Sequence, residues 1–203
     1  MLQRPTPRLI LASASASRRA LLTGAGLAFE VRPADIDEAA VKRAARVTGL
    51  NGEDTALRLA GLKAAAVAYR EPQALVIGAD QILVCGDVWH DKPNDVEAAR
   101  EQLRALRGRQ HVLATAVVCH RGGGQVWHHV TSPRLAMRSF TEAFLTDYLA
   151  SEGDAVTGTV GSYRLEGLGV HLFGAVEGDH SAILGLPLLP LLGFLREAGV
   201  LAA

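Results

Sequence analysis

The chain has no excess of charge and very few cysteines. Its 203 residues include 21 Lys plus Arg and 21 Asp plus Glu, so its formal net charge at pH 7 is zero. Duplex nucleic acids bind proteins through wide basic surfaces, and we therefore expect no nucleic-acid partner. A small basic pocket for a phosphorylated ligand remains compatible with this balance. We interpret Cys85 and Cys119, each inside an apolar run, as reduced core thiols and not as a disulfide framework.

Long hydrophobic runs are also lacking. The apolar run at residues 9–12 is too short for a signal peptide. Residues 182–195 are apolar for 14 positions but contain Pro187 and Pro190, whereas a membrane span needs about 20 residues. We therefore expect a soluble cytoplasmic protein without a membrane partner.

Several well-known motifs are missing as well. The chain has no G-x-x-x-x-G-K-[ST] loop and no G-x-G-x-x-G after a predicted strand. It also lacks H-x-x-x-H and H-E-x-x-H, the spacings of helical zinc ligands. His128 and His129 are adjacent and would face opposite sides of a strand, so they do not form a simple ligand pair.

What is present is the alternation of an α/β fold with a mixed sheet. No linker, repeat or low-complexity stretch divides the chain, so we expect one domain over residues 1–203. Residues 35–38 are expected as an acidic loop. The predicted strands cover 8–12, 29–32, 74–78, 82–85, 88–90, 112–119, 125–137 and 170–173. A first predicted helix ends near residue 25, and the other predicted helices cover about 54–69, 95–106, 141–150 and 188–198.

Three places could carry chemistry. At residues 13–19, small hydroxyl residues and Arg18 lie where a strand turns into a helix, whose N-terminus stabilises anions. Asp80 is expected at the carboxyl end of a buried strand, where a carboxylate can bind a metal or act as a general base. Lys92, in a rigid loop before Pro93, can bind phosphate. Simpler interpretations are an ordinary helix cap, a turn-forming aspartate and a solvated lysine.

Six segments, in order and spacing, resemble the Maf family of nucleotide pyrophosphatases. The similarity covers about residues 9–199. It implies a Maf/ITPase-like α/β fold, in which helices flank an elongated mixed β-sheet and two lobes leave a central cleft. The segments are 11–18 (LASASASR), 34–38 (ADIDE), 77–81 (IGADQ), 92–93 (KP), 161–167 (GSYRLEG) and 177–187 (EGDHSAILGLP).

The resemblance implies hydrolysis of a nucleoside triphosphate to the monophosphate and pyrophosphate, with a divalent cation such as Mg²⁺ or Mn²⁺. Asp80 matches the catalytic base, and Glu38 matches an acidic partner for metal or water. Both are therefore expected to bind the metal. The positions matched to anion and phosphate binding are Ser13, Arg18, Lys63 and Lys92.

Three further positions concern the nucleobase. Gln81 and Glu166 resemble the branch of the family that acts on 7-methyl-GTP, whereas the branch acting on dTTP and UTP has Thr and Gln there. A carboxylate at Glu166 can accept two hydrogen bonds from guanine, which suits that base better than thymine. Ser17 departs from both branches, which have Arg or a large aromatic residue at this position.

Other functions remain open at this point. The chain could be a dTTP/UTP pyrophosphatase, or a phosphatase of a smaller ester. Because the family is associated with septum formation, a second hypothesis is a regulator that binds nucleotide without turnover. A homodimer is expected from the resemblance alone.

Overall fold

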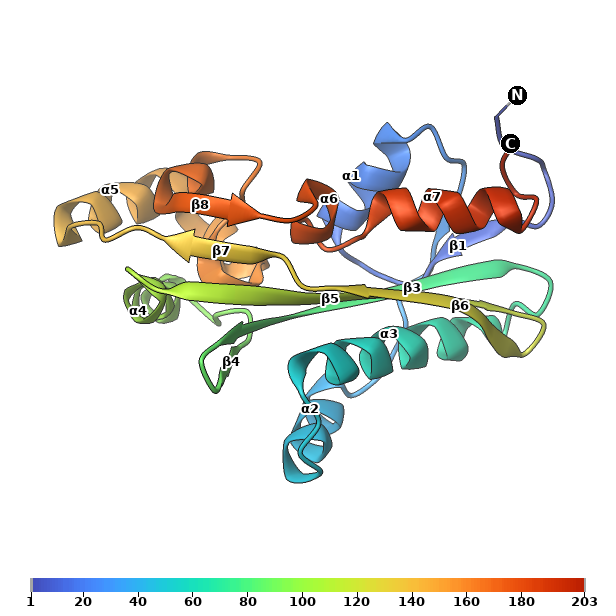
Figure 1. Cartoon of the computed structure of the whole chain (residues 1–203), viewed down its shortest axis with the longest axis horizontal. Helices are drawn as coiled ribbons and strands as arrows, with labels where there is room; N and C mark the ends of the chain where they lie inside the picture. Colours follow the sequence, from blue (N-terminus) through green and yellow to red (C-terminus); the bar gives the residue numbers. More distant parts are fainter. Residues whose placement is uncertain (1, 203) are drawn as a thin grey trace. The chain divides into compact units, whose positions relative to one another are not determined.

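The chain divides into two compact units, and a computed structural model describes residues 2–202 (Figure 1). Unit 1 comprises the chain up to Gln81, residues Thr115–Thr131 and the chain from His180 onward. Unit 2 comprises Ile82–Ala114 and Ser132–Asp179. Strands β3 (Leu75–Cys85) and β5 (Gln110–Arg121) contribute residues to both units.

Eight strands form a mixed sheet flanked by helices, so the α/β class expected from the sequence is confirmed. In unit 1, β1 pairs in parallel with β2 and β3, and β5 pairs antiparallel with β6. The helices of unit 1 lie in the connections between strands or after the last strand of the chain. Its further elements are β1 (Leu9–Leu11), α1 (Ala16–Gly24), β2 (Glu30–Val31), α2 (Glu38–Val47), α3 (Gly52–Ala68), β6 (Gly124–Thr131), α6 (His180–Ile183) and α7 (Leu188–Glu197).

The two faces of the unit 1 strands have different neighbours. Figure 1 shows α1 and α7 on one face and α3 on the other. Alternate residues of a strand point to opposite faces. On the α1/α7 face they form a buried apolar core that removes helix and strand surfaces from water together. Its members include Leu9, Leu11, Leu22, Leu75, Ile77, Ala79, Val117, Leu191 and Leu195.

On the opposite face, α3 lies against the backbone of β3. A Cβ atom added to Gly78 would stand 2.2 Å from the carbonyl oxygen of Ala60 and 2.9 Å from Cβ of Ala64. Only glycine allows this approach. Asp80 points to the same face as Gly78, two residues away, and Lys63 lies on the same face of α3 as Ala60 and Ala64. The close packing therefore brings Lys63 to Asp80.

Unit 2 consists of short elements around the ends of β3 and β5. Here β3 pairs antiparallel with β4, β5 with β7, and β7 with β8. Asp95 caps α4 by accepting from the Ala98 amide at 2.7 Å, and Thr141 caps α5. The elements are β4 (Val88–His90), α4 (Val96–Leu106), β7 (Arg134–Met137), α5 (Glu142–Glu152), the 3₁₀ helices η1 (Gly153–Gly158), η2 (Val160–Ser162) and η3 (Leu168–Leu172), and β8 (Phe173–Glu177).

Several predicted boundaries are wrong. The strands predicted at 74–78 and 82–85 form one continuous strand, β3. The strand predicted over 125–137 is interrupted between β6 and β7, where Pro133 has no amide to donate to a ladder. The strand predicted at 170–173 is mostly η3, and β8 begins only at Phe173.

The helix α2 was not expected at all. Its sequence carries a short apolar stripe at Ala40, Val41, Ala44 and Ala45, but among its ten residues only Ala45 is buried. Local interactions stabilise it instead: the Asp37 side chain accepts from the Ala40 amide at 2.8 Å, with Glu38 in the first turn and Arg46 in the last. None of the helices within residues 2–202 combines the length and apolar character that a membrane crossing requires.

The contact at Gly78 yields a first prediction. Gly78→Ala should lower the free energy of unfolding by about 3 kcal/mol, because the new methyl group meets backbone that has little room to move. Gly61→Ala is the matched control, since a Cβ there meets no atom within 4 Å and should stabilise α3 by roughly 0.5–1 kcal/mol. Urea unfolding measures both. Equal stability of the two variants would contradict the close packing.

Candidate active site

A buried ammonium group between two carboxylates forms the centre of the site in unit 1. Nζ of Lys63 lies 2.5 Å from Oδ1 of Asp80 and 2.8 Å from Oε1 of Glu38. Lys63 and Asp80 are 7% and 5% exposed, whereas about half of the Glu38 side chain is accessible. Burial of a charge is costly unless it is paired and hydrogen-bonded, which is the arrangement here. An ammonium has three N–H donors, so one remains for a ligand.

The position of Asp80 corrects one expectation. It lies in the middle of β3, not at the end of a strand. The parallel pairing with β1 nevertheless stops at Ile77, and the Ala12 amide donates to the Ile77 carbonyl there. The carboxylate therefore stands just beyond the parallel part of the sheet, where α/β proteins place functional groups. The hydrogen bonds of the described residues use only its Oδ1, which leaves Oδ2 for a ligand or water.

Glu38 owes its position to the N-terminus of α2. Burial alone would raise the pKa of Glu38, but the hydrogen bond from Lys63 and the charges of Lys63, Lys42 and Arg18 hold that pKa below its usual value. The carboxylate is therefore ionised at neutral pH. Lys42 is a cation that the sequence analysis missed. The i, i+4 spacing from Glu38 would have revealed it if α2 had been predicted.

Arg18 ties three segments of unit 1 together. Its Nε donates to the Gly185 carbonyl at 2.8 Å, and its Nη1 donates to the Ala79 carbonyl at 2.8 Å and to Oγ of Ser13 at 3.1 Å. Gly185 has φ +99°, and a Cβ there would stand 3.2 Å from Nε of Arg18. Burial lowers the pKa of Arg18, while the charges of Asp80 and Glu38 oppose that effect. Its Nη2 carries the donors left for an anion.

The turn before α1 is both a cap and a polar surface. Ser15 is the N-cap and its Oγ accepts from the Arg18 amide at 3.4 Å, which confirms the simpler interpretation for this residue. Oγ of Ser13, which is buried, accepts from the Ser15 amide at 3.2 Å as well as from Arg18. Ser17 is half-buried in the first turn of the helix. The turn is thus held in one conformation before any ligand binds.

Gln81 points to the sheet face opposite Asp80. Its Nε2 donates to Oγ1 of Thr115 at 2.8 Å and to the carbonyls of Ala182 and Ile183 at 3.0 and 3.1 Å. Thr115 also donates to the Ala182 carbonyl at 3.1 Å. Because its amide nitrogen already serves α6, Gln81 has only Oε1 to offer a ligand. Its assignment to base recognition stays a prediction.

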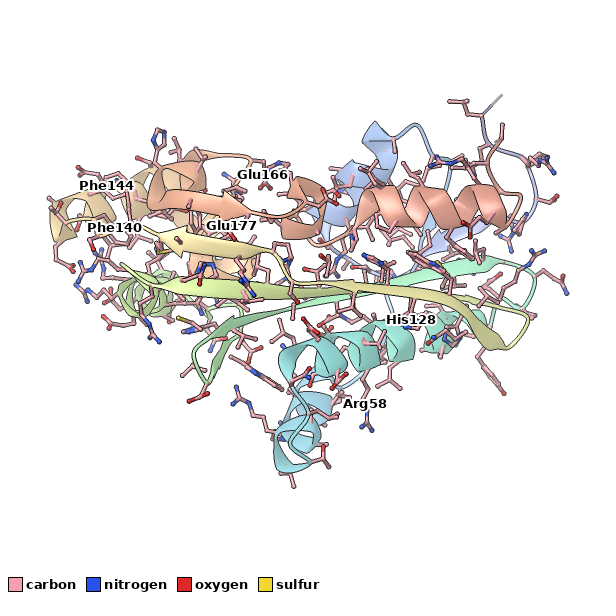
Figure 2. All side chains as sticks on the ribbon, in the orientation of Figure 1. Arg58, His128, Phe140, Phe144, Glu166 and Glu177 are labelled. Carbon is pink, nitrogen blue, oxygen red and sulfur yellow. The ribbon has the colours of Figure 1, made fainter. Side chains whose placement is uncertain are left out.

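Two predicted residues belong to unit 2. Lys92 is exposed and is followed by the buried Pro93. Glu166 is also exposed and lies in the turn between η2 and η3 (Figure 2). Their assignments to phosphate and nucleobase stay predictions. The predicted residues that the structure brings together are those of unit 1: Ser13, Arg18, Glu38, Lys63 and Asp80.

The donor set is suited to a hard cation. No three His, Cys, Asp or Glu side chains gather as a metal cage within residues 2–202. Mg²⁺, however, is typically held by one or two carboxylates, with substrate phosphates and water supplying the other ligands. Glu38 and Asp80, which share Lys63, match that requirement, and each has an oxygen outside the Lys63 contact.

These features define an α/β protein with a preorganised cationic site beside two carboxylates, a chemistry suited to polyphosphate. The family described as "Maf-like protein" matches residues 8–198 of this sequence. The chain belongs to the Maf family.

Curated relatives cover nearly the whole chain. A nucleoside triphosphate pyrophosphatase of Granulibacter bethesdensis is 54% identical over 94% of this chain and 96% of its own length. A protein of the same name from Rhodospirillum rubrum is 49% identical over 96% of both chains. A 7-methyl-GTP pyrophosphatase of Rhizobium etli is 47% identical over 97% of this chain and 98% of its own. Both names thus occur among relatives of comparable identity.

The Arg18 contacts lead to a second prediction. Arg18→Lys should lower the free energy of unfolding by about 2–4 kcal/mol, because an ammonium does not reproduce the fork that reaches Gly185, Ala79 and Ser13. Arg19→Lys, at the exposed neighbouring position, is the matched control and should be neutral within about 0.5 kcal/mol. Denaturant titrations of both variants check this. A stable Arg18→Lys protein would show that the three contacts do not support the fold.

Proposed function

We propose that this protein hydrolyses nucleoside triphosphates to nucleoside monophosphates and pyrophosphate. The observation that carries the proposal is Lys63 buried between Asp80 and Glu38, with Arg18 anchored next to them. The names of the relatives support the reaction type. A triphosphate brings about four negative charges, and cations fixed before binding stabilise the charge that develops during cleavage.

In the proposed reaction, the oxygen of water attacks the α-phosphorus and the bond from that phosphorus to the α–β bridging oxygen breaks. Oδ2 of Asp80 orients the water and accepts its proton. The third N–H of Lys63 and Nη2 of Arg18 bind phosphate oxygens, while their other donors hold the site together. Pyrophosphate leaves with the bridging oxygen. No covalent enzyme intermediate is required.

Further groups complete the proposal. Lys92 is assigned to the phosphates, with Ser13 in the anion-binding turn, from their match to the family's pattern. Asp80 and Glu38 would hold a divalent cation, which supplies additional positive charge to the phosphates. Because Glu38 is ionised at neutral pH, it can bind such a cation without first losing a proton.

We assign base preference to Glu166 and favour 7-methylguanine. Guanine presents N1–H and the exocyclic amine to a carboxylate, and the positive charge of the methylated base adds attraction. Thymine and uracil present one N–H between two carbonyl oxygens, which a carboxylate opposes. Two relatives, each 47% identical to this chain, carry the 7-methyl-GTP name, which supports this assignment.

The reaction is tested with a panel of 7-methyl-GTP, GTP, UTP, dTTP and CTP in the presence of Mg²⁺ or Mn²⁺. Pyrophosphate should be the first inorganic product, and Asp80→Asn should lower kcat by about 10²–10⁴-fold because the proton acceptor is lost. Asp87→Asn, at an exposed hairpin position, is the control and should keep full activity.

Other outcomes would point to other functions. Orthophosphate as the first product would identify a phosphatase. Nucleotide binding without turnover by the wild-type protein would favour a regulator. Undiminished turnover by Asp80→Asn would remove the assignment of the base.

Base preference is tested with Glu166→Gln. The ratio of kcat/KM for 7-methyl-GTP over UTP should fall about 5- to 150-fold, equivalent to roughly 1–3 kcal/mol, because the amide donates where guanine also donates. Glu177→Gln, another exposed glutamate of unit 2 (Figure 2), should leave the ratio unchanged. An unaltered ranking of substrates in Glu166→Gln would exclude this carboxylate as the base reader.

A further inference from the structure

Gln102 of α4 makes two hydrogen bonds to segments that are distant from it in sequence. Its Nε2 donates to the Asp91 carbonyl at 2.8 Å, and its Oε1 accepts from Oγ of Ser162 at 3.0 Å. A backbone carbonyl only accepts, so the orientation of the amide is determined by its partners. Both ends of the side-chain amide are therefore used.

Ser162 is held in an unusual conformation. It is fully buried, and it is the one non-glycine residue within residues 2–202 with a positive φ, +60°. Its carbonyl accepts from the hydroxyl of Tyr148 at 3.1 Å, and its own hydroxyl donates to Gln102. A backbone in this region persists only where its surroundings impose it, and such residues concentrate at functional sites.

The two segments that Gln102 joins are those that carry Lys92 and Glu166. Asp91 directly precedes Lys92, and Pro93 on the other side restricts the backbone of Lys92 further. Ser162 lies four residues before Glu166, in the segment 161–167. The side chains of Lys92 and Glu166 are exposed, so their positions depend largely on the segments that carry them. Within unit 2, Gln102 links these segments through the Asp91 carbonyl and the Ser162 hydroxyl.

We propose that Gln102 is a positioning residue that holds the Lys92 loop and the segment of Glu166 in register with each other. The proposal rests on the function proposed above, in which Lys92 binds phosphate and Glu166 the base. Without the Nε2 bond the Asp91 carbonyl loses its contact with α4 and the loop gains conformations. Lys92 then loses more conformational freedom on binding a phosphate, which weakens binding more than it slows the chemical step.

The test compares two changes at Gln102. Gln102→Met has a similar length and removes both hydrogen bonds, while Gln102→Glu keeps the acceptor for Ser162 and places an oxygen against the Asp91 carbonyl. We expect both to raise KM for 7-methyl-GTP about tenfold with less than a threefold change in kcat. Gln110→Met, at an exposed position of β5, is the control and should keep both constants.

A double-mutant cycle separates positioning from general damage. In a Lys92→Ala background, Gln102→Glu should raise KM less than twofold further, because the group it positions is already gone. Hydrogen exchange of the amides at residues 91, 92, 94 and 95 should be faster in both Gln102 variants. Thermal unfolding shows whether each variant is folded, and the cycle uses whichever variant keeps the wild-type midpoint.

The outcomes distinguish the two proposals. No pyrophosphate release by the wild-type protein, or an unchanged KM in Lys92→Ala, would overturn the proposed function and this inference together. If wild type is active and Lys92→Ala raises KM, then additive effects in the cycle, wild-type constants in the Gln102 variants or unfolding of both variants would overturn the inference alone.

Discussion

The contact on which unit 1 depends is the buried pair of Lys63 and Asp80. Neither charge is tolerated in the interior without the other, since an unpaired buried charge costs far more than the pair gains. The pair forms only because Gly78 lets α3 reach the backbone of β3, two residues before Asp80. The packing of α3 on β3 and the pairing of the two charged groups of the site therefore depend on the same contact. Glu38 adds a second carboxylate from α2, and its exposure gives the buried pair a polar path to solvent.

The cations of the site combine support with reactivity. Arg18 uses Nε and Nη1 for three protein oxygens and keeps Nη2, while Lys63 uses two of its donors and keeps one. Groups held in this way need no reorganisation when a polyphosphate arrives, which is the condition for strong electrostatic stabilisation of a transition state. Gly185 contributes to this arrangement in two ways. Its carbonyl accepts a hydrogen bond from Arg18, and its lack of a Cβ atom leaves space for the guanidinium.

The two residues of unit 2 that we propose for substrate binding, Lys92 for phosphate and Glu166 for the base, have a different setting. Both are exposed on irregular segments, where a change of residue costs the core little. In our proposal their positions come from the backbone that carries them, which the half-buried Gln102 and the buried Ser162 restrict. A family of enzymes can therefore vary its base preference on such segments while the buried pair remains unchanged.

The sequence by itself determined the α/β class, most elements and the membership of Asp80, Lys63 and Arg18 in one chemical set. Apolar periodicity and ordered motifs are local properties that a linear chain displays. The prediction from sequence lacked α2, of which only one residue is buried, and divided the continuous β3 into two strands. Only the tertiary structure decided that Gln81 contacts the carbonyls of α6 and that Glu38 of α2 meets Lys63 of α3. Which groups meet across helices and strands depends on packing, and packing is not encoded at neighbouring positions.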